Sequence, residues 1–246
     1  EIRSRGLGDV YKRQKPMIKL GVPSKGRLME ETFSWFDSRG VYLERTESKR
    51  EYAGYVKGIQ GIELLLLSAS EIPTELNEGR IHFGVTGSDL VCEKVPNWGQ
   101  NLEAIKYLGF GFADLVLSVP KFWIDVDTLD DLDSVAEAFR KKHGFRLRIA
   151  TKYHYLAREF LKSAGVADYQ LVDSQGATEG TVKNETAEAI ADITSTGETL
   201  KANHLKILDD GLIHSSEATL FKSKSAFFSE KQKAAASTFL TLILSD

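Results

Sequence analysis

The sequence is poor in cysteine, in net charge and in long apolar runs. Its 246 residues include one cysteine, Cys92, which excludes an internal disulfide and a zinc site built from several cysteines. The longest apolar candidates, 64–67 and 239–244, fall far short of the ~18 residues of a membrane span, so we expect no membrane association. The net charge of −3 offers no global basic field, so we expect no nucleic-acid partner.

The composition that remains is typical of a globular protein with a buried core. Hydrophobic residues make up 42% and charged residues 27% of the chain, which fits one large domain or two small ones. A single cysteine is most simply explained by a reducing, cytoplasmic location. Residues 1–16 contain basic residues but no apolar block, so we interpret them as a non-native or disordered extension rather than a secretory signal, with Met17 as the natural start.

Apolar segments of strand length alternate with helix-like segments from Met17 onward. In the first half, strands are expected at 18–22, 62–68 and 81–86, and helices at about 28–37 and 70–77. Nearly continuous apolar strands flanked by helices are typical of a parallel sheet that is covered on both faces. The fold class is therefore α/β.

The second half begins the same pattern again. Strands are expected at 113–119, 146–151, 169–172 and 189–193, with helices at 129–142 and 155–164. The first helix has acidic residues in its first turn and basic residues in its last, as the helix dipole favours. Two such βα sets predict two lobes with a cleft between them. With one crossing at 109–111 and a return strand near 205–212, we expect lobe I at 17–108 plus 211–246 and lobe II at 109–210.

A hydroxyl-rich turn follows the expected strand 189–193. Asp192 ends this strand, and a helix is expected to begin at about Glu198, which would place backbone N–H groups and the helix dipole beside several hydroxyl donors. The residues that would surround a phosphate group here are Thr194, Ser195, Thr196, Gly197 and Thr199. Asp192 could accept hydrogen bonds from sugar hydroxyls or help to hold a hydrated Mg²⁺. The alternative is that these threonines only cap a helix.

Basic residues follow the first expected strand, where open α/β sheets bind ligands. Lys25 and Arg27 flank Gly26 and could bind phosphate or pyrophosphate, although the turn could equally be a solvated basic surface. Asp89 lies in a second strand-to-helix turn and could bind substrate or cap a helix. Arg50 and Arg80 could reach ATP phosphates, but surface arginines are usually only solvated.

The segment from Glu179 to Leu200 resembles the ATP phosphoribosyltransferase signature. That pattern has a glutamate, a spaced glycine and a small-and-apolar strand, followed by Asp-apolar-x-x-Thr-Gly-x-Thr-Leu; residues 187–200 read AEAIADITSTGETL. Further matches stand in the family's order: PSKGR at 23–27, GRIHFGVTGSDL at 79–90, LGFG at 108–111, RIATKY at 148–153 and SQGATE at 174–179. The resemblance covers roughly residues 17–224, and several matches together make chance unlikely. One position departs from the pattern: Glu185 replaces the family glycine, and a positive φ there would strain this turn.

The resemblance implies a two-lobed fold like that of the type II periplasmic binding proteins, with the active site in the interlobe cleft. Phosphoribosyl pyrophosphate would bind on lobe II against Asp192 to Thr199, with Glu179 at the ribose hydroxyls and Lys25 and Arg27 at the pyrophosphate or at ATP. Only one helix-length of chain follows Lys224, so the chain resembles the short form of the family. Short-form enzymes form homo-oligomers and associate with a regulatory subunit that resembles histidyl-tRNA synthetase.

The implied reaction transfers the phosphoribosyl group to N1 of the ATP adenine and releases pyrophosphate, as the first step of histidine biosynthesis. The N1 atom already has a lone pair, so no general base is required, and Mg²⁺ would stabilise the leaving pyrophosphate. Two alternatives remain at this point. One is a non-catalytic small-molecule-binding protein of the same two-lobed fold, and the other is a phosphoribosyltransferase with a different acceptor.

Overall fold

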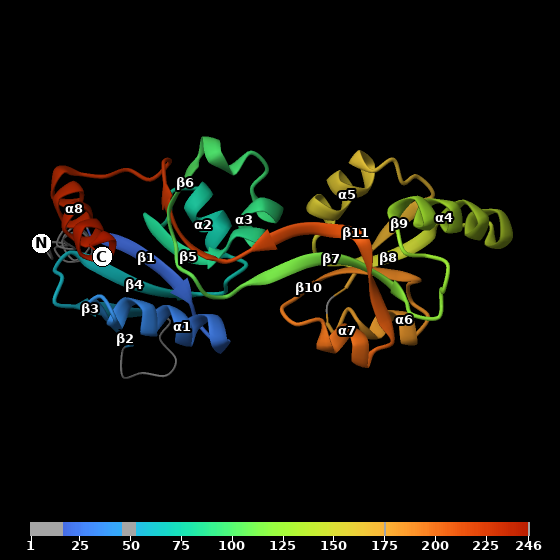
Figure 1. Cartoon of the computed structure of the whole chain (residues 1–246). Coiled ribbons are helices and arrows are strands. Elements are labelled where there is room, and N and C mark those ends of the chain that lie inside the picture. The colour runs from blue at the N-terminus through green and yellow to red at the C-terminus, as the bar shows by residue number, and fades with distance from the viewer. Residues whose placement is uncertain (1–16, 46–52, 175, 246) are drawn as a thin grey trace, which may run out of the picture. The chain divides into compact units, whose positions relative to one another are not determined.

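A computed structural model describes residues 17–45, 53–174 and 176–245 and divides the chain into two units. Unit 1 comprises residues up to Val91, Asn97–Gly111, and Ala218 onward, whereas unit 2 comprises Cys92–Pro96 and Phe112–Glu217. Each unit contains one sheet with helices on both of its faces (Figure 1). The two-unit α/β architecture expected from the sequence is therefore confirmed. The extension expected at residues 1–16 lies outside the described residues.

Unit 1 is built on a seven-stranded mixed sheet. The strands are β1 (Ile18–Pro23), β2 (Tyr42–Arg45), β3 (Ala53–Lys57), β4 (Ile62–Leu67), β5 (Phe83–Gly87), β6 (Leu102–Tyr107) and β12 (Ala218–Ser223). Their order is β2-β3-β4-β1-β5-β12-β6. Strand β1 pairs in parallel with β4 and β5, as predicted. However, β12 runs antiparallel to both β5 and β6, and β2 and β3 form an antiparallel ribbon at the edge.

The helices of unit 1 form two layers around this sheet. Helices α1 (Gly26–Asp37) and α8 (Glu230–Leu244) share one core with the strands, in which the rings of Phe36 and Phe239 stack with centroids 6.0 Å apart. Helices α2 (Ile72–Asn77) and α3 (Ser88–Lys94) contribute to the core on the other face. A short 3-10 turn, η2 (Trp98–Gln100), precedes β6.

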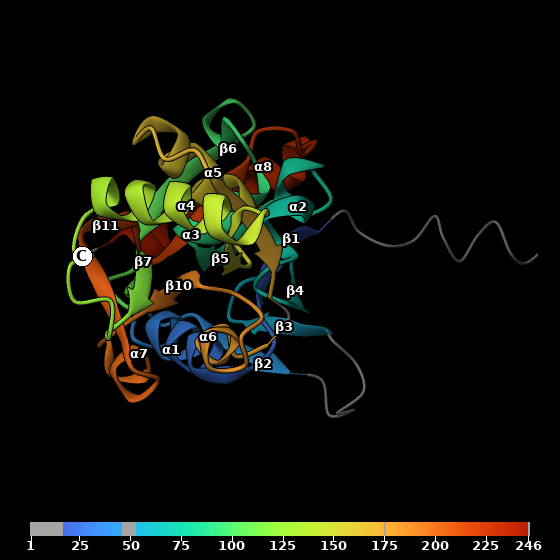
Figure 2. The ribbon, with the colours of Figure 1, turned by 90° about the vertical axis from the view of Figure 1, so that its right-hand side faces the viewer.

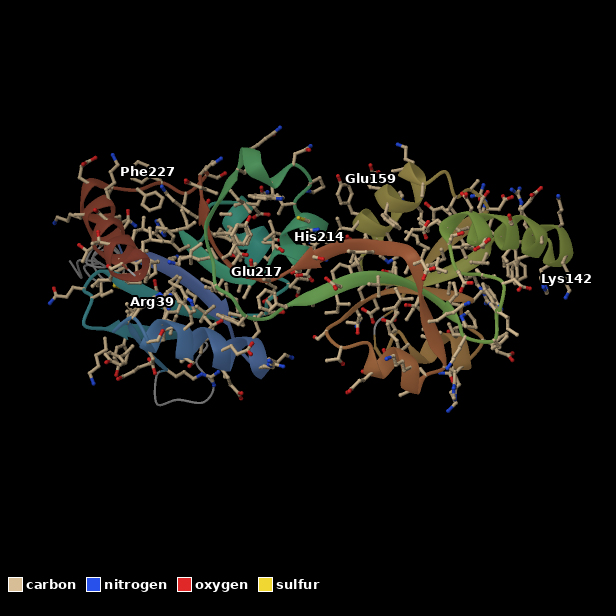
Figure 3. The ribbon with its side chains drawn as sticks, viewed as in Figure 1. Arg39, Lys142, Glu159, His214, Glu217 and Phe227 are labelled. Atoms are coloured by element: carbon tan, nitrogen blue, oxygen red, sulfur yellow. The ribbon has the colours of Figure 1, made fainter. Side chains whose placement is uncertain are left out.

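A buried histidine connects three segments of unit 1. His82 Nδ1 accepts a hydrogen bond from the backbone N–H of Lys19 at 3.0 Å, so this nitrogen carries no proton. The other ring nitrogen, Nε2, therefore carries the proton and donates to the carbonyl of Phe227 at 3.2 Å. Phe227 lies in the loop before α8, where its side chain projects from the surface (Figure 3). Burial lowers the pKa of His82, which keeps the ring neutral.

Unit 2 is built on a five-stranded sheet. Its strands are β7 (Ala113–Pro120), β8 (Leu147–Thr151), β9 (Tyr169–Asp173), β10 (Ala189–Thr194) and β11 (Leu205–Ser216). The order is β11-β7-β10-β8-β9, with β10, β8 and β9 parallel and β7 antiparallel to both of its neighbours. Unit 1 follows the same scheme in β4-β1-β5-β12-β6. In both sheets, three parallel strands are followed by one antiparallel strand.

Helices cover both faces of the second sheet. Helices α4 (Leu129–His143) and α5 (His154–Ser163) lie on one face, and the short helices α6 (Gly180–Lys183) and α7 (Glu198–Ala202) lie on the other (Figures 1 and 2). A capping box between Thr128 and Asp131 begins α4, and basic residues such as Lys142 occupy its last turn (Figure 3). In the described residues, no helix is long and apolar enough to cross a bilayer.

The chain passes between the units slightly later than the sequence predicted. The short segment Cys92–Pro96 already belongs to unit 2, and the first lasting passage follows Gly111 rather than residue 108. The Phe110 carbonyl accepts the N–H of Ala218 at 2.9 Å, which keeps this residue in unit 1. The second follows Glu217 rather than residue 210, because β11 continues along β7 as far as Ser216 despite register shifts. Apolar periodicity does not reveal such a continuation, since β11 alternates irregularly.

Candidate functional site

A polar cavity of about 330 Å³ lies at the carboxyl end of β10 in unit 2. It is lined by Ala113, Glu179, Asp192, Ile193, Thr194, Ser195, Thr196, Thr199 and Leu200. Two larger hollows, of about 550 Å³ at α8 and about 390 Å³ beside the start of α4, have mostly apolar walls. Of these three hollows in the described part of the chain, the cavity at β10 is the one that combines several hydroxyls with carboxylates, so we consider it the candidate site.

The turn after β10 is held by its own hydroxyls. Gly197 adopts a left-handed conformation with φ 75°, and its N–H donates to Thr194 Oγ1 at 2.9 Å. The N–H of Glu198 donates to Thr196 Oγ1 at 3.3 Å. These contacts are the helix capping that we considered, from the sequence, as the alternative to phosphate binding. They do not exclude anion binding, because a hydroxyl oxygen that accepts one hydrogen bond still has its own O–H to donate.

Backbone donors also remain at this turn. Among the described residues, the N–H groups of Thr196 and Thr199 have no protein acceptor. The helix that follows, α7, has five residues, so the dipole that the sequence led us to expect is small. Hydroxyls and individual N–H groups, rather than a long helix, are therefore the groups of this turn that could bind an anion.

Asp192 is half-buried and lines the cavity. Its Oδ1 accepts the backbone N–H of Ile193 at 2.9 Å, and its carboxylate also accepts the hydroxyl of Thr178. Burial raises the pKa of Asp192, while these two hydrogen bonds and the charge of Lys152 oppose the rise. The charge of Glu179, which lines the same cavity, adds to the rise. Two carboxylates thus border a cavity that also contains hydroxyl and N–H groups able to donate hydrogen bonds to an anion.

The described residues contain no group of three or more His, Cys, Asp or Glu side chains that could hold a metal ion. Mg²⁺ does not require such a group, because it keeps several waters and is usually held by one or two carboxylates together with substrate phosphates. The carboxylates of Asp192 and Glu179 fit this mode of binding, in which the metal arrives with a phosphorylated substrate.

The remaining predicted site residues belong to unit 1. Lys25 precedes α1, and the exposed Arg27 pairs with Glu31 at 2.8 Å, a surface ion pair that a phosphate could replace at little cost. Arg80 donates two hydrogen bonds to Glu75, at 2.8 and 2.6 Å, and pairs with Glu78.

Those contacts of Arg80 favour a structural role within unit 1. Asp89 is buried in the first turn of α3. Arg50 lies outside the described residues. None of the unit 1 residues lines the cavity at β10, which brings together only the predicted residues of unit 2.

Three residues at this site were not singled out from the sequence alone. Thr178 contacts Asp192, Ser174 contacts Thr178, and Lys152 acts on Asp192 through its charge. Each follows the carboxyl end of a strand that runs parallel to β10, either its neighbour β8 or the next strand, β9. The position after each parallel strand is the signal that could have identified them. Fold and site together define a class: a two-unit α/β protein with a polar cavity, lined by hydroxyls and carboxylates, at the carboxyl end of a parallel strand.

Comparison with known proteins identifies the family within this class. The family model described as HisG: ATP phosphoribosyltransferase matches residues 68–243, and the chain belongs to this family. An ATP phosphoribosyltransferase from Cereibacter sphaeroides is 69% identical over 213 residues, covering 87% of this chain and 90% of the relative. One from Bradyrhizobium sp. strain ORS 278 is 48% identical, covering 92% of this chain and 69% of the relative.

A solved structure shares the fold. The ATP phosphoribosyl transferase (HisG:HisZ) complex from Thermotoga maritima contains a chain that matches with a TM-score of 0.70 and 24% identity, covering 92% of this chain and 96% of that one. The substrate-binding protein of an amino acid ABC transporter matches with a TM-score of 0.47 and 14% identity, covering 92% and 91%. The family relationship confirms the expected activity, a transfer of the phosphoribosyl group to ATP in histidine biosynthesis.

Proposed function

We propose that the cavity at β10 binds the phosphoribosyl part of phosphoribosyl pyrophosphate. The observation that carries this proposal is that one cavity gathers Asp192, Glu179 and the hydroxyl-rich turn. The turn, with the side chains of Thr194, Ser195, Thr196 and Thr199 and the left-handed Gly197, would hold the 5-phosphate. Asp192 and Glu179 would accept hydrogen bonds from the ribose hydroxyls, because carboxylates are acceptors for such donors.

The chemistry requires positioning and charge stabilisation rather than proton removal. The bond between ribose C1′ and the pyrophosphate oxygen breaks, and a bond from C1′ to N1 of adenine forms through an oxocarbenium-like state. The carboxylates beside the ribose favour the positive charge that develops on the sugar. Aligning two anionic substrates supplies much of the remaining rate enhancement. Mg²⁺, when bound, would neutralise the leaving pyrophosphate.

Lys25 and Arg27 remain our candidates for binding the pyrophosphate or the ATP phosphates. Lys25 follows β1 and precedes α1, Arg27 lies in the first turn of α1, and both residues are exposed. Arg27 would exchange its pairing with Glu31 for a bidentate contact with phosphate. We assign weaker phosphate-binding roles to Arg50 and Arg80, of which Arg80 has the competing contacts with Glu75 and Glu78. We assign a weaker substrate-binding role to Asp89.

We also infer that the chain acts as a short-form catalytic subunit in the cytoplasm. It covers 90% of the Cereibacter relative, so the two have similar lengths. The matching Thermotoga maritima structure is a complex of HisG with HisZ. We therefore expect homo-oligomers of this chain and a hetero-oligomer with a regulatory subunit that resembles histidyl-tRNA synthetase. Co-purification of the two subunits after co-expression tests this, and failure of the two to associate would contradict it.

Replacing Thr196 with valine tests the phosphoribosyl site. The substitution keeps the side-chain shape but removes a hydroxyl that lines the cavity, so Thr196→Val should raise KM for phosphoribosyl pyrophosphate about tenfold. The KM for ATP should not change. The control is Thr238→Val on the exposed face of α8, which removes a hydroxyl far from the cavity in sequence.

Pyrophosphate release with both substrates and Mg²⁺ is the assay, and other bases in place of ATP test the acceptor. Chelation of Mg²⁺ should abolish the release. An unchanged KM for phosphoribosyl pyrophosphate in Thr196→Val would contradict the assignment of this turn.

A further inference from the structure

Two buried hydroxyls form a series of hydrogen bonds that ends at the Asp192 carboxylate. Ser174 Oγ lies 2.9 Å from Thr178 Oγ1, and the Thr178 hydroxyl is hydrogen-bonded to the Asp192 carboxylate. Thr178 is fully buried and Ser174 is 4% exposed, so solvent does not compete for either hydroxyl. Neither side chain lines the cavity, whereas Asp192 does.

The chemistry of the three groups fixes the direction of these hydrogen bonds. An ionised carboxylate only accepts, so the Thr178 hydroxyl donates its proton to Asp192. The oxygen of Thr178 is then free to accept, and Ser174 donates to it. The series therefore runs in one direction, from Ser174 through Thr178 to the carboxylate. Hydrogen bonds in such a series strengthen one another in a dry environment.

The backbone around these hydroxyls is held by other contacts. The N–H of Ser174 donates to the carbonyl of Thr151 at 3.2 Å. The carbonyl of Thr178 accepts both the N–H of Thr181 at 3.0 Å and the Thr181 hydroxyl at 2.7 Å. Because these contacts position the chain without the two hydroxyls, the series contributes chiefly to the orientation of Asp192.

The carboxylate retains acceptor capacity after these contacts. Two oxygens provide about four lone-pair positions, of which the Ile193 N–H and the Thr178 hydroxyl occupy one each. About two positions are left, which match the two neighbouring hydroxyls of a ribose ring. A carboxylate that could rotate freely would offer these positions in many directions and would lose binding energy when the sugar fixed it.

We propose that Ser174 and Thr178 are positioning residues that hold the Asp192 carboxylate in the orientation that receives the ribose hydroxyls of phosphoribosyl pyrophosphate. This inference rests on the proposed role of Asp192 at the ribose. It adds a pair of residues that never touch the substrate and act only through Asp192.

The test compares substitutions that remove or keep the Thr178 hydroxyl. Thr178→Val should raise both the Kd and the KM for phosphoribosyl pyrophosphate about tenfold, because a hydrogen bond to a charged group is lost. The KM for ATP should stay within about twofold, and kcat should change less than the KM for phosphoribosyl pyrophosphate, because the charge of Asp192 remains when its hydrogen bond from Thr178 is lost. Thr178→Ser should restore binding to within about threefold, since the donor returns. Ser174→Ala should have a smaller effect of about threefold, because the Thr178 donor remains.

The measurements use the full chain. Isothermal titration calorimetry with phosphoribosyl pyrophosphate and Mg²⁺ gives Kd, and pyrophosphate release gives the two KM values and kcat. Thr181→Val is the matched control, because it removes a hydroxyl from the same segment whose hydrogen bond ends on the Thr178 backbone instead of Asp192. Circular dichroism establishes that each variant folds. If Thr178→Val does not fold, Ser174→Ala and Thr178→Ser decide the question by the size and order of their effects.

A mutant cycle separates this inference from the proposed function. Asp192→Asn should weaken phosphoribosyl pyrophosphate binding, and Thr178→Val should then add less than about a twofold effect, because its target is already lost. Unchanged binding in Asp192→Asn would overturn the proposed role of Asp192 itself. Weakened binding in Asp192→Asn with normal binding in Thr178→Val would overturn only the positioning role. Equal losses in Thr178→Val and Thr178→Ser would indicate a packing role and would also overturn it.

Discussion

Glu185 ends helix α6 in a left-handed conformation, with φ 58°, where the family pattern has glycine. The N–H of Thr186 donates to the carbonyl of Thr181 at 2.9 Å, and the N–H of Glu185 donates to the carbonyl of Val182 at 3.1 Å. These two hydrogen bonds form the Schellman motif, which requires a left-handed residue and usually has glycine there. The Cβ of Glu185 is therefore strained for as long as the motif is formed. Replacing Glu185 with glycine should stabilise the protein.

The magnitude follows from two opposing effects. For a residue with a Cβ, the left-handed conformation costs about 1–2 kcal/mol of conformational energy. Glycine avoids this cost, but about 0.5–1 kcal/mol of the gain is offset because glycine has more conformational freedom in the unfolded chain and loses it on folding. Glu185→Gly should therefore raise the free energy of unfolding by about 0.5–1 kcal/mol, which corresponds to an increase in Tm of about 1–4 °C. The hydrogen bond from Arg148 Nη2 to the Glu185 carbonyl, at 3.0 Å, involves the backbone and should persist.

Urea unfolding followed by circular dichroism measures this difference, and calorimetry gives the Tm. Glu185→Ala is the control, because it removes the charge of this exposed side chain but keeps the Cβ. Glu185→Ala should give no comparable gain in the free energy of unfolding. Equal stabilisation by alanine and glycine would show that charge, not backbone conformation, limits this turn. A loss of stability in Glu185→Gly would refute the reasoning altogether.

Two further predictions concern unit 1. Gly79 and Gly40 both have positive φ, but a Cβ at Gly79 would lie 2.8 Å from the Ser225 carbonyl oxygen, whereas a Cβ at Gly40 meets nothing within 4 Å. Gly79→Ala should thus lower the free energy of unfolding by about 1–3 kcal/mol more than Gly40→Ala, and equal losses in urea unfolding would contradict this. His82 has a lowered pKa in the folded protein, so its neutral form contributes stability that is complete above its unfolded pKa of about 6.5 and is lost as the pH falls toward the lower folded value. His82→Gln should make the loss of stability between about pH 7 and pH 5 smaller, and an unchanged pH dependence would exclude His82 as its source.

The sequence predicted the elements that carry strong apolar patterns. Strands β1, β4, β7 and β10 and helices α4 and α5 lie within one or two residues of the predicted bounds. The antiparallel strands were the main difference. Strand β12 follows β11 after the single residue Glu217, so no turn signal marks its start. Its place between β5 and β6 depends on contacts distant in sequence, which local periodicity does not encode.

The candidate site was predictable to the extent that it is contiguous in sequence. Asp192 and the following turn lie in one segment, and the structure places them around one cavity. The contact between Thr178 and Asp192 joins separate segments through the packing of parallel strands, so it emerged only from the structure. The left-handed conformation of Glu185 was anticipated as a possibility because glycine is the family's residue at that position.

The position of β12 between β5 and β6 in the first sheet has a consequence for synthesis on the ribosome. Strands β5 and β6 are made early, but the strand that separates and pairs with both arrives only after all of unit 2 has been made. Until then, the facing edges of β5 and β6 present unpaired backbone groups to other nascent chains. The unit that is begun first is thus completed last, and its open edges are the ones that a chaperone would have to cover.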